Sequence, residues 1–459
     1  MEMDNKSGSA LYITKVCFVA ALGGLLFGYD TAIIAGATPF LKPHFQLNDF
    51  MLGWAVSSVL IGCIVGAASA GYISDKFGRK KVLIVCALLF AISAIWSGLA
   101  STLSEFIFAR WIGGLGVGAA SMLSPMYISE ISPAKIRGRL VSLNQLTIVI
   151  GMLAAYGVNY ALKNIGETNW RWMFASETLP AVAFFILLFT VPESPRWLVK
   201  QQKESQALDI LSKVGGQTHA ENEMLEIKNA LTHEDNSIAM LFKPGMKIAL
   251  TIGIALAVLQ QITGINIILY YAPIIFENMG FERDASLLNT VAVGVAMLTA
   301  TLIAITFVDK IGRKLLLLIG SAGMGLCLMM VGISMQYDIF KDLAIGSIVI
   351  PKGYFIIAFI VGYIAFFASS LGPIVWVVMS EIFPTKIRGR AMSISTVALW
   401  IACFGVSLAF PVMLERLPSM ATFGIFAAMC VVMFVFTLIV LPETKGKTLE
   451  EIEKYWIKD

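Results

Sequence analysis

Charged residues are scarce in this sequence. Only 14% of its 459 residues are Asp, Glu, Lys or Arg, whereas 58% are hydrophobic. A soluble domain carries about 25% charged residues. The composition therefore excludes an ordinary soluble protein and indicates a chain that lies largely within a lipid bilayer.

Histidine and cysteine are also rare, and neither forms a recognisable site. The three histidines, His44, His219 and His233, fall in predicted loops. The six cysteines lie in apolar stretches at unrelated spacings, which is typical of small packing residues. We therefore expect no disulfide framework, no metal and no cofactor. A membrane-embedded enzyme is disfavoured as well, because the apolar stretches contain no nucleophile–base or metal-ligand constellation.

Long apolar runs, by contrast, are abundant. A spanning helix needs about 20 mostly apolar residues. The chain has twelve such stretches, at about 12–36, 52–74, 82–100, 106–128, 140–162, 173–192, 247–276, 287–308, 315–335, 354–379, 391–413 and 421–441. Lipid does not tolerate open strand edges, and the stretches are too long for barrel strands. The sequence predicts an all-α membrane protein with twelve transmembrane helices.

Three motifs occur twice, in the same order along the chain. The pairs are ISEISPAKIRGR at 128–139 with MSEIFPTKIRGR at 379–390, DKFGRK at 75–80 with DKIGRK at 309–314, and PES at 192–194 with PET at 442–444. Many secondary transporters are built by duplication of this kind. We therefore expect two pseudo-symmetric six-helix halves.

The chain divides into four predicted parts. These are an N-terminal half at 1–192, a cytoplasmic linker at 193–246, a C-terminal half at 247–441 and a cytoplasmic tail at 442–459. Within the linker, 204–214 and 220–231 have helical periodicity and predict two short helices. In the tail, TLEE at 448–451 has the pattern of a capping box and predicts one more amphipathic helix.

Lys and Arg residues are unevenly distributed between the loops. The loops after the second, fourth, eighth and tenth spans hold nearly twice as many as the loops on the other side. The positive-inside rule places the richer loops, the linker and both termini in the cytoplasm.

Three charged residues fall inside the apolar stretches. Asp30, Arg110 and Glu177 all map to the outer half of the bilayer, where a charge is costly and usually functional or paired. A nearby Arg favours the charged form of a carboxylate, and isolation favours the neutral form. A conformational change that brings Asp30 and Arg110 together or apart would release or bind a proton. The alternative is a static ion pair that fixes helix packing.

Uncharged polar residues concentrate in the seventh span. Gln260, Gln261 and Asn266 lie near the middle of the membrane, followed by Tyr270. Gly264 and Pro273 weaken the helix there, and a broken span often marks a binding site. Amides without charge suit a neutral ligand rich in hydroxyl groups. Interhelical hydrogen bonding is the alternative.

Two tryptophans lie in other spans of the C-terminal half. Trp376 follows a second expected helix break at Gly372-Pro373, and Trp400 lies mid-span. Aromatic rings can cover the apolar faces of a sugar, although each tryptophan taken alone fits packing better. Gln145 in the fifth span adds a polar group of undetermined direction.

Acidic and basic residues recur together in the repeated loops. The matched positions permit ion-pair networks between the cytoplasmic ends of the helices. The alternative is that the basic residues only set the membrane topology. Acidic residues contribute little to topology, so their presence in every copy argues against this alternative. The members of these sets are Asp75, Arg79, Glu130, Arg137, Asp309, Arg313, Glu381 and Arg388.

Together these motifs resemble the sugar porters of the major facilitator superfamily, over essentially the whole chain. The segments that carry the resemblance are 78–80, 192–197, 260–266, 130–139, 381–390 and 442–446. Within the family, the chain is most similar to the bacterial D-xylose:proton symporters, through 23–30, 113–127 and 174–177.

The resemblance implies roles for individual residues. It assigns the sugar contacts to Phe27, Gln145, Gln260, Gln261, Asn266, Tyr270, Trp376 and Trp400. It assigns proton binding to Asp30, with Arg110 as its partner and Glu177 assisting. The loop ion pairs become a cytoplasmic gate that stabilises the outward-open state. Leu399 and Met297 replace polar residues of relatives, which bears on the choice of sugar.

The expected function is secondary active import of a neutral monosaccharide with a proton, by alternating access. D-Xylose and a glucose-type hexose are nearly level as substrates, and a polyol is a further option. The expected protein is a monomer in a bacterial inner membrane, with a lipid bilayer and no nucleic acid as partner. A facilitative uniporter is the main alternative. A sugar sensor is disfavoured because the tail is short.

Overall fold

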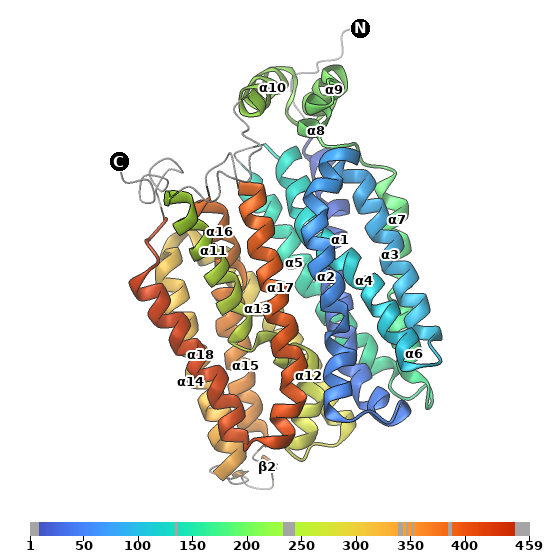
Figure 1. Ribbon diagram of the computed structural model, residues 1–459, viewed down its shortest axis with the longest axis vertical. Coiled ribbons are helices and arrows are strands. Elements are labelled where there is room, and N and C mark those ends of the chain that lie inside the picture. The colour runs from blue at the N-terminus through green and yellow to red at the C-terminus, as the bar shows by residue number, and fades with distance from the viewer. Residues whose placement is uncertain are drawn as a thin grey trace.

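The structure is a computed structural model, and it describes residues 9–133, 136–232, 244–337, 343–345, 348–350, 353–383 and 388–445. Within these ranges, twelve helical segments are long and apolar enough to cross a membrane. Figure 1 shows them side by side along the long axis of the molecule. The predicted all-α architecture with twelve spans is confirmed.

The helices fall into three groups along the chain. Those of the first six spans, here called the N half, are α1 (Ala10–His44), α2 (Asp49–Phe77), α3 (Arg79–Leu99), α4 (Leu103–Ile131), α5 (Arg137–Leu162), α6 (Asn169–Ser176) and α7 (Thr178–Leu188). The linker helices are α8 (Pro195–Lys200), α9 (Glu204–Gly215) and α10 (Gln217–Thr232). Those of the last six spans, the C half, are α11 (Pro244–Ile262), α12 (Ile265–Asn278), α13 (Arg283–Ile311), α14 (Arg313–Tyr337), α15 (Gly353–Ser369), α16 (Leu371–Ile382), α17 (Arg388–Arg416) and α18 (Ser419–Ile439).

Three spans consist of two helices each. The seventh breaks at Gly264, whose φ of 97° is a left-handed conformation that favours glycine. This break agrees with the sequence prediction, whereas Pro273 lies within α12 without ending it. The tenth span breaks at Ser370, slightly before the predicted Gly372. The sixth breaks at Glu177, which the sequence did not predict.

Close helix packing occurs within each half and at three contacts between them. In the N half, α1 packs along α5 and α2 along α4, while α14 packs on α15 and α18 in the C half. The halves meet where α2 lies on α17, α5 on α13 and α1 on α12. The backbones of α1 and α5 approach so closely that a Cβ on Gly28 would collide with the Ile148 carbonyl.

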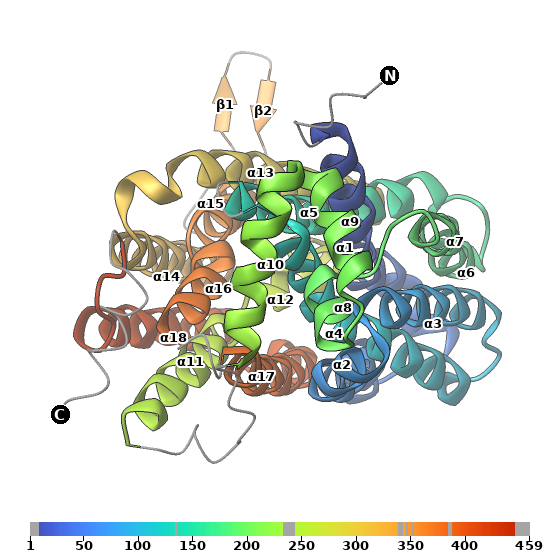
Figure 2. The same cartoon turned by 90° about the horizontal axis from the view of Figure 1, so that it is seen from above.

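The linker helices lie across one end of the bundle, as Figure 2 shows from above. Helices α9 and α10 agree with the two predicted linker helices, and α8 is an addition capped by Ser194. The backbone N–H of Ser9 donates to the Lys213 carbonyl at 3.0 Å, so the first described residue docks on α9. We call this end the linker face and the opposite end the far face.

Some sequence expectations are corrected. The loop after α14 contains a small antiparallel hairpin of β1 (Leu343–Ile345) and β2 (Ile348–Ile350), seen at the far face in Figure 1. His44 is the last residue of α1 and His219 lies within α10, so neither is in a loop. His233 and the helix expected after Thr448 lie outside the described residues.

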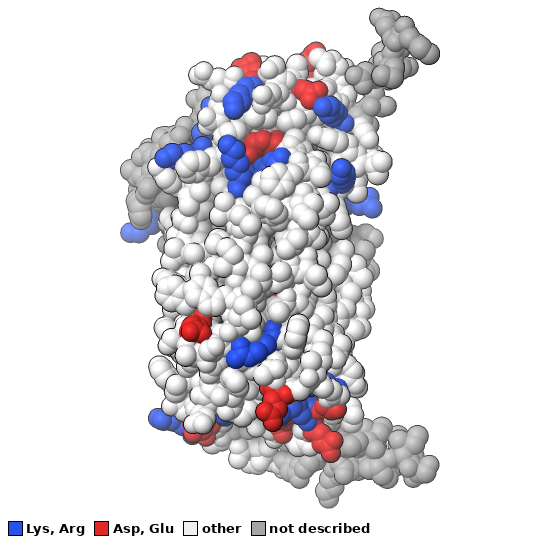
Figure 3. All heavy atoms as spheres, turned by 90° about the vertical axis from the view of Figure 1, so that its right-hand side faces the viewer, with Lys and Arg blue, Asp and Glu red and all other residues white. Residues whose placement is uncertain are grey.

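The surface follows the composition. Figure 3 shows Lys, Arg, Asp and Glu gathered at both ends of the molecule, with a broad belt between them that is almost entirely uncharged. Large apolar side chains such as Ile186, Leu326 and Ile439 are exposed on the spanning helices. Lipid tails satisfy such a surface, whereas water does not.

Candidate functional site

Three amide side chains form a connected chain at the break between α11 and α12. Asn266 Nδ2 donates to Gln261 Oε1 at 2.5 Å, and Gln261 Nε2 donates to Gln260 Oε1 at 3.2 Å. The turn at Gly264 brings the end of α11 and the start of α12 close enough for these contacts. The predicted polar cluster of the seventh span is therefore formed.

Gln260 also ties two helices together. Its Nε2 donates to the Leu371 carbonyl at 2.7 Å and to the Gly372 carbonyl at 3.3 Å, where α16 begins. A carbonyl oxygen has two lone pairs, so each of these groups can accept this bond in addition to a helical one. The amide nitrogen of Gln260 is thus committed to interhelical bonding, and Gln261 and Asn266 are the freer members of the cluster.

An aromatic pair joins the two halves beside the amides. The rings of Phe27 on α1 and Trp400 on α17 meet edge to face, with centroids 5.7 Å apart. Trp400 is buried, and its Nε1 has no hydrogen-bond partner among the described residues. A buried N–H donor without an acceptor is costly, so Nε1 is well suited to donate to a ligand oxygen. Trp376 on α16 is half-buried.

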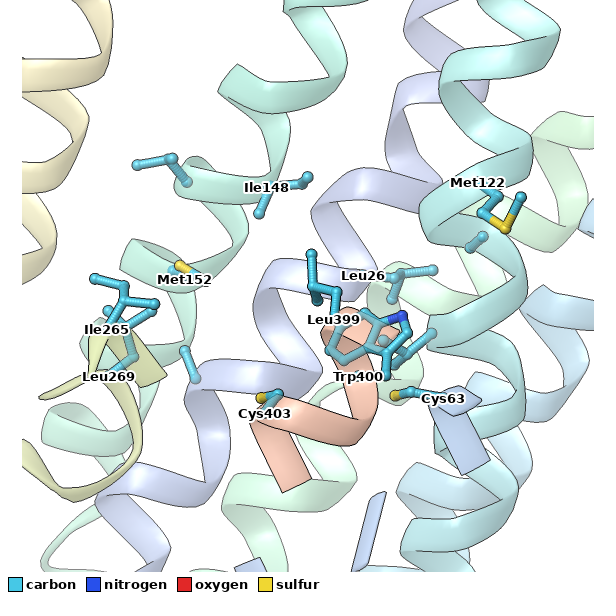
Figure 4. Packing of buried hydrophobic residues seen from close by; sticks show 14 of the residues in the cluster. Leu26, Cys63, Met122, Ile148, Met152, Ile265, Leu269, Leu399, Trp400 and Cys403 are labelled. Carbon is cyan, nitrogen blue, oxygen red and sulfur yellow. The ribbon is translucent and has the colours of Figure 1, made fainter. Parts of the chain in front are cut away.

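The region around Trp400 is otherwise apolar. Figure 4 shows Leu399 and Trp400 on α17 in the same part of the core as Leu26 from α1 and Ile148 and Met152 from α5. Leu399 is buried next to Trp400, and Met297 on α13 is buried as well. Both positions are therefore occupied by packed apolar side chains.

Cys403 is a member of the cluster that the sequence analysis missed. Asn266 Nδ2 donates to its Sγ at 3.0 Å, and Cys403 lies one turn after Trp400 on α17. Cys403 follows Trp400 by three residues, so both lie on one face of the helix. This spacing could have identified Cys403 from the sequence. Tyr270 is buried on α12, and Gln145 is half-buried on α5 in the N half.

The three charged residues predicted inside the membrane are brought together in the N half. Arg110 Nη1 donates to Asp30 Oδ1 at 2.5 Å and Nη2 donates to Oδ2 at 3.1 Å, which is a bidentate pair. Both side chains are 1% exposed, and the guanidinium also stacks over Phe174 at 5.2 Å. A bidentate geometry of this kind fixes the orientation of both partners.

Glu177 is as deeply buried as the pair. It is 1% exposed and lies at the break between α6 and α7. Neither of its carboxylate oxygens has a hydrogen-bond partner among the described residues. An unpaired buried carboxylate costs several kcal/mol if ionised, so Glu177 is suited to hold a proton.

An ion-pair network occupies the linker face of the N half. Arg79 donates to Asp75 Oδ1 at 2.8 Å and, through Nη2 and Nε, to both oxygens of Glu130 at 2.9 Å. Ser194 Oγ donates to Glu130 at 2.5 Å, and Glu193 accepts from the backbone N–H of Arg79 at 2.9 Å. The network thus ties the starts or ends of α2, α3, α4 and α8 together.

The C half repeats this arrangement at matched residues. Arg313 donates to Glu381 at 3.2 Å, Thr444 Oγ1 donates to Glu381 at 2.6 Å, and Glu443 accepts from the backbone N–H of Arg313 at 3.1 Å. The repeated PES and PET motifs therefore have a structural role that sequence analysis did not assign. Burial alone would raise the pKa of Glu443, but backbone N–H groups of Lys445, Arg313, Lys314 and Thr444 hold it below its usual range.

A glycine opens the helix at each of these networks. Gly78 and Gly312 have φ values of 101° and 107°, and a Cβ at either position would meet the carboxylate of Glu193 or Glu443. Only glycine combines this backbone conformation with that space. The second repeated motif thus exists to seat a carboxylate against the first N–H groups of α3 and α14.

The other predicted loop residues differ in outcome. Arg137 pairs with Glu223 of α10 at 3.3 Å, so it fastens the linker to the start of α5. The side chains of Asp309 and Arg388 lie outside the described residues.

The two halves are joined closely at the far face. Tyr156 of α5 donates to the Leu269 carbonyl of α12 at 2.9 Å, and Lys163 pairs with Asp284 at 2.6 Å. A cavity of about 600 Å³ opens on this side, and Tyr271 and Phe410 are among its lining residues. Tyr271 is buried and donates to the Ser407 carbonyl at 2.8 Å. These contacts hold the two halves together at the far face.

Comparison with known proteins assigns the chain to a family. Residues 16–456 match the family model described as sugar (and other) transporter. The chain belongs to this sugar transporter family. It is 45% identical to the arabinose-proton symporter of Bacillus subtilis, over 99% of this chain and 97% of that protein. It is 42% identical to the D-xylose-proton symporter of Escherichia coli, over 98% of this chain and 97% of that one.

The fold of this family member also has a solved counterpart. The xylose transporter XylE from E. coli, in a partially occluded inward-open conformation, superposes with a TM-score of 0.84 at 41% sequence identity. The match covers 96% of this chain and all of the solved chain. The resemblance to the major facilitator sugar porters is thereby confirmed, together with its fold. The family consists of transporters.

Proposed function

We propose that this transporter imports a neutral monosaccharide together with a proton, by alternating access. The observation that carries the proposal is the position of Phe27. Its ring contacts Trp400 beside the amide cluster, and it lies one helical turn from Asp30 on α1. A single helix thus joins the candidate sugar contacts to the buried ion pair, which gives sugar binding and protonation a direct physical connection.

The sugar is bound between the amides of the C half and the aromatic pair. Gln261 and Asn266 offer donors and acceptors to hydroxyl groups, and Trp400 Nε1 offers one more donor. The ring face of Trp400 covers an apolar sugar face. Gln145, Gln260, Tyr270 and Trp376 complete the proposed contacts, with Gln260 acting mainly by positioning Gln261.

The substrate class follows from the relatives and the site. The named relatives carry arabinose and xylose, so we propose an aldopentose first and a glucose-type hexose second. Leu399 and Met297 support the smaller sugar, because buried apolar groups leave extra hydroxyls without partners.

Asp30 carries the proton. In the present arrangement, Arg110 stabilises the ionised carboxylate, so proton loss accompanies formation of the pair. Separation of α1 from α4 would weaken the pair and favour protonation. Glu177 assists as a second acid in the same buried layer.

Alternating access moves the two halves around this site. The far-face contacts are closed, and the linker-face networks of Arg79, Glu130, Arg313 and Glu381 form the opposing gate. We place the linker face and both termini in the cytoplasm because Lys and Arg are enriched in its loops. The proposal includes the domain boundaries 1–192, 193–246, 247–441 and 442–459, a monomeric state and a bacterial inner membrane.

The test is a pH trace of weakly buffered, de-energised cells that express the protein, with arabinose, D-xylose and D-glucose added in turn. Alkalinisation on adding a sugar identifies both the substrate and proton symport. Equilibration of labelled sugar without a pH change would identify a facilitative uniporter and leave Asp30 and Arg110 as a structural pair. Cells with the Asp30→Asn variant are the control for sugar-independent drift.

A further inference from the structure

The buried ion pair lies in a layer with unusually many unsatisfied polar atoms. Among the described residues, Ser93 Oγ, Ser97 Oγ, Arg110 Nε, both oxygens of Glu177 and Thr178 Oγ1 have no hydrogen-bond partner. Buried polar atoms nearly always have one, and each exception needs an explanation. These atoms come from α3, α4 and the α6–α7 break, and α3 packs against α4, α6 and α7.

Ser93 is an uncharged member of this group that borders Asp30. Gly113 of α4 separates them, and a Cβ on Gly113 would lie 2.4 Å from Ser93 Oγ and 3.5 Å from Asp30 Oδ1. Both oxygens therefore border the same small space. Ser93 is 1% exposed, so its hydroxyl has no access to bulk water.

The two protonation states of Asp30 have different hydrogen-bond needs. In the ionised state, Arg110 supplies a donor to each carboxylate oxygen. In the protonated state, the carboxyl group becomes a donor itself and requires an acceptor. A hydroxyl oxygen can accept this bond, either directly or through one bridging water.

We propose that Ser93 is a positioning residue for proton binding, because its hydroxyl accepts the hydrogen bond of protonated Asp30. This inference rests on the proposed role of Asp30 and extends it to a residue of α3. It predicts that Ser93 stabilises mainly the protonated state, since Arg110 already satisfies the ionised one.

Other titratable groups face Asp30 from the neighbouring helices. They are Arg110 from α4, Glu177 from the α6–α7 break, Cys63 from α2 and Tyr270 from α12. Ser93 differs from all of them because its side chain is not an ionisable group. Its removal therefore changes the proton affinity of Asp30 without adding or removing a charge.

The experiment measures sugar uptake against pH in proteoliposomes of the full-length protein. Ser93→Ala should lower the apparent proton affinity roughly three- to tenfold, which is the range of one hydrogen bond, and so move the pH midpoint to more acidic values. Ser93→Thr should restore the midpoint. Sugar affinity at saturating proton concentration should stay unchanged.

A second variant tests the same space from the other side. Gly113→Ala places a methyl group where it displaces the Ser93 hydroxyl, so it should reproduce the acidic shift even if Ser93→Ala folds poorly. Ser334→Ala is the matched control. Ser334 is a buried serine on α14, the C-half counterpart of α3, and its hydroxyl also has no hydrogen-bond partner within the described part of the chain. It should leave the midpoint unchanged.

The outcomes separate this inference from the proposed function. If Asp30→Asn abolishes uphill uptake but the Ser93→Ala and Gly113→Ala profiles superimpose on the wild type, the role of Ser93 is wrong and the role of Asp30 stands. If Asp30→Asn still accumulates sugar, the proposed proton site itself is wrong.

Discussion

The N and C halves have matching ion-pair networks at the linker face and different chemistry in the core. Arg79, Glu130 and Glu193 in one half correspond to Arg313, Glu381 and Glu443 in the other. In the core, the N half contributes the buried pair of Asp30 and Arg110. The C half contributes the amide cluster of Gln260, Gln261 and Asn266.

This comparison shows where the two halves have kept the same residues and where they have diverged. Each half has a helix start with backbone N–H groups that need an acceptor, so the same carboxylate motif is useful twice. A carrier with one proton site and one ligand site needs each of these only once. The halves therefore differ most in the layer where the proposed sites lie.

The largest expected effect comes from removing the buried carboxylate of Asp30 in the N half. We expect Asp30→Asn to reduce the accumulation ratio to about one, because the carboxamide neither binds nor releases a proton. Sugar exchange across the membrane should persist. Counterflow and uphill uptake in the same vesicles check this result, and wild-type accumulation in the variant would contradict it.

The next effect comes from the amide cluster of the C half. Gln261→Ala removes the acceptor of Asn266 and a proposed ligand contact, so sugar affinity should fall on the order of 30-fold, equivalent to about 2 kcal/mol. Calorimetry on purified protein measures it. Gln217→Ala on the exposed linker helix α10 is the control and should bind sugar normally.

The two linker-face networks should differ in strength. Glu130 accepts from Arg79 and Ser194, and the side chains of the Arg79–Glu130 pair are 7% and 8% exposed, whereas those of Arg313 and Glu381 are 14% and 22% exposed. Glu130→Gln should lower the free energy of unfolding by about 2 kcal/mol and Glu381→Gln by about 1 kcal/mol. Thermal unfolding of both variants in detergent compares them, and equal losses would remove the predicted asymmetry.

The smallest effect concerns the acid dependence of the C-half network. The pKa of Glu443 is lowered in the folded state, so its stabilisation is present above its unfolded value of about 4.3 and is lost as the pH falls below this. Because the residue is half-buried, we expect less than about 1 kcal/mol. Melting temperatures of wild type and Glu443→Gln should converge at low pH. A constant difference down to pH 3 would argue against this role.

Most of the architecture could be predicted from residue patterns. Twelve apolar stretches are readable because lipid requires each span to satisfy its own backbone. The break at Gly264 was predictable because glycine weakens a helix locally, and the linker helices followed from their periodicity. The break at Glu177 was not predicted, although Pro180 in the first turn of α7 was an available signal, because proline is tolerated in a first helical turn and disrupts a helix interior.

The sequence by itself determined which residues are unusual in a membrane: Asp30, Arg110, Glu177 and the amides of the seventh span. Composition alone makes them stand out, since charges and amides are costly in lipid. Only the tertiary structure decided their partners. Asp30 meets Arg110 from a helix 80 residues away, Gln260 is committed to α16, Arg137 pairs with α10, and Ser93 borders Asp30 across Gly113. These contacts depend on how helices that are distant in the chain pack together, and local sequence patterns do not determine that packing.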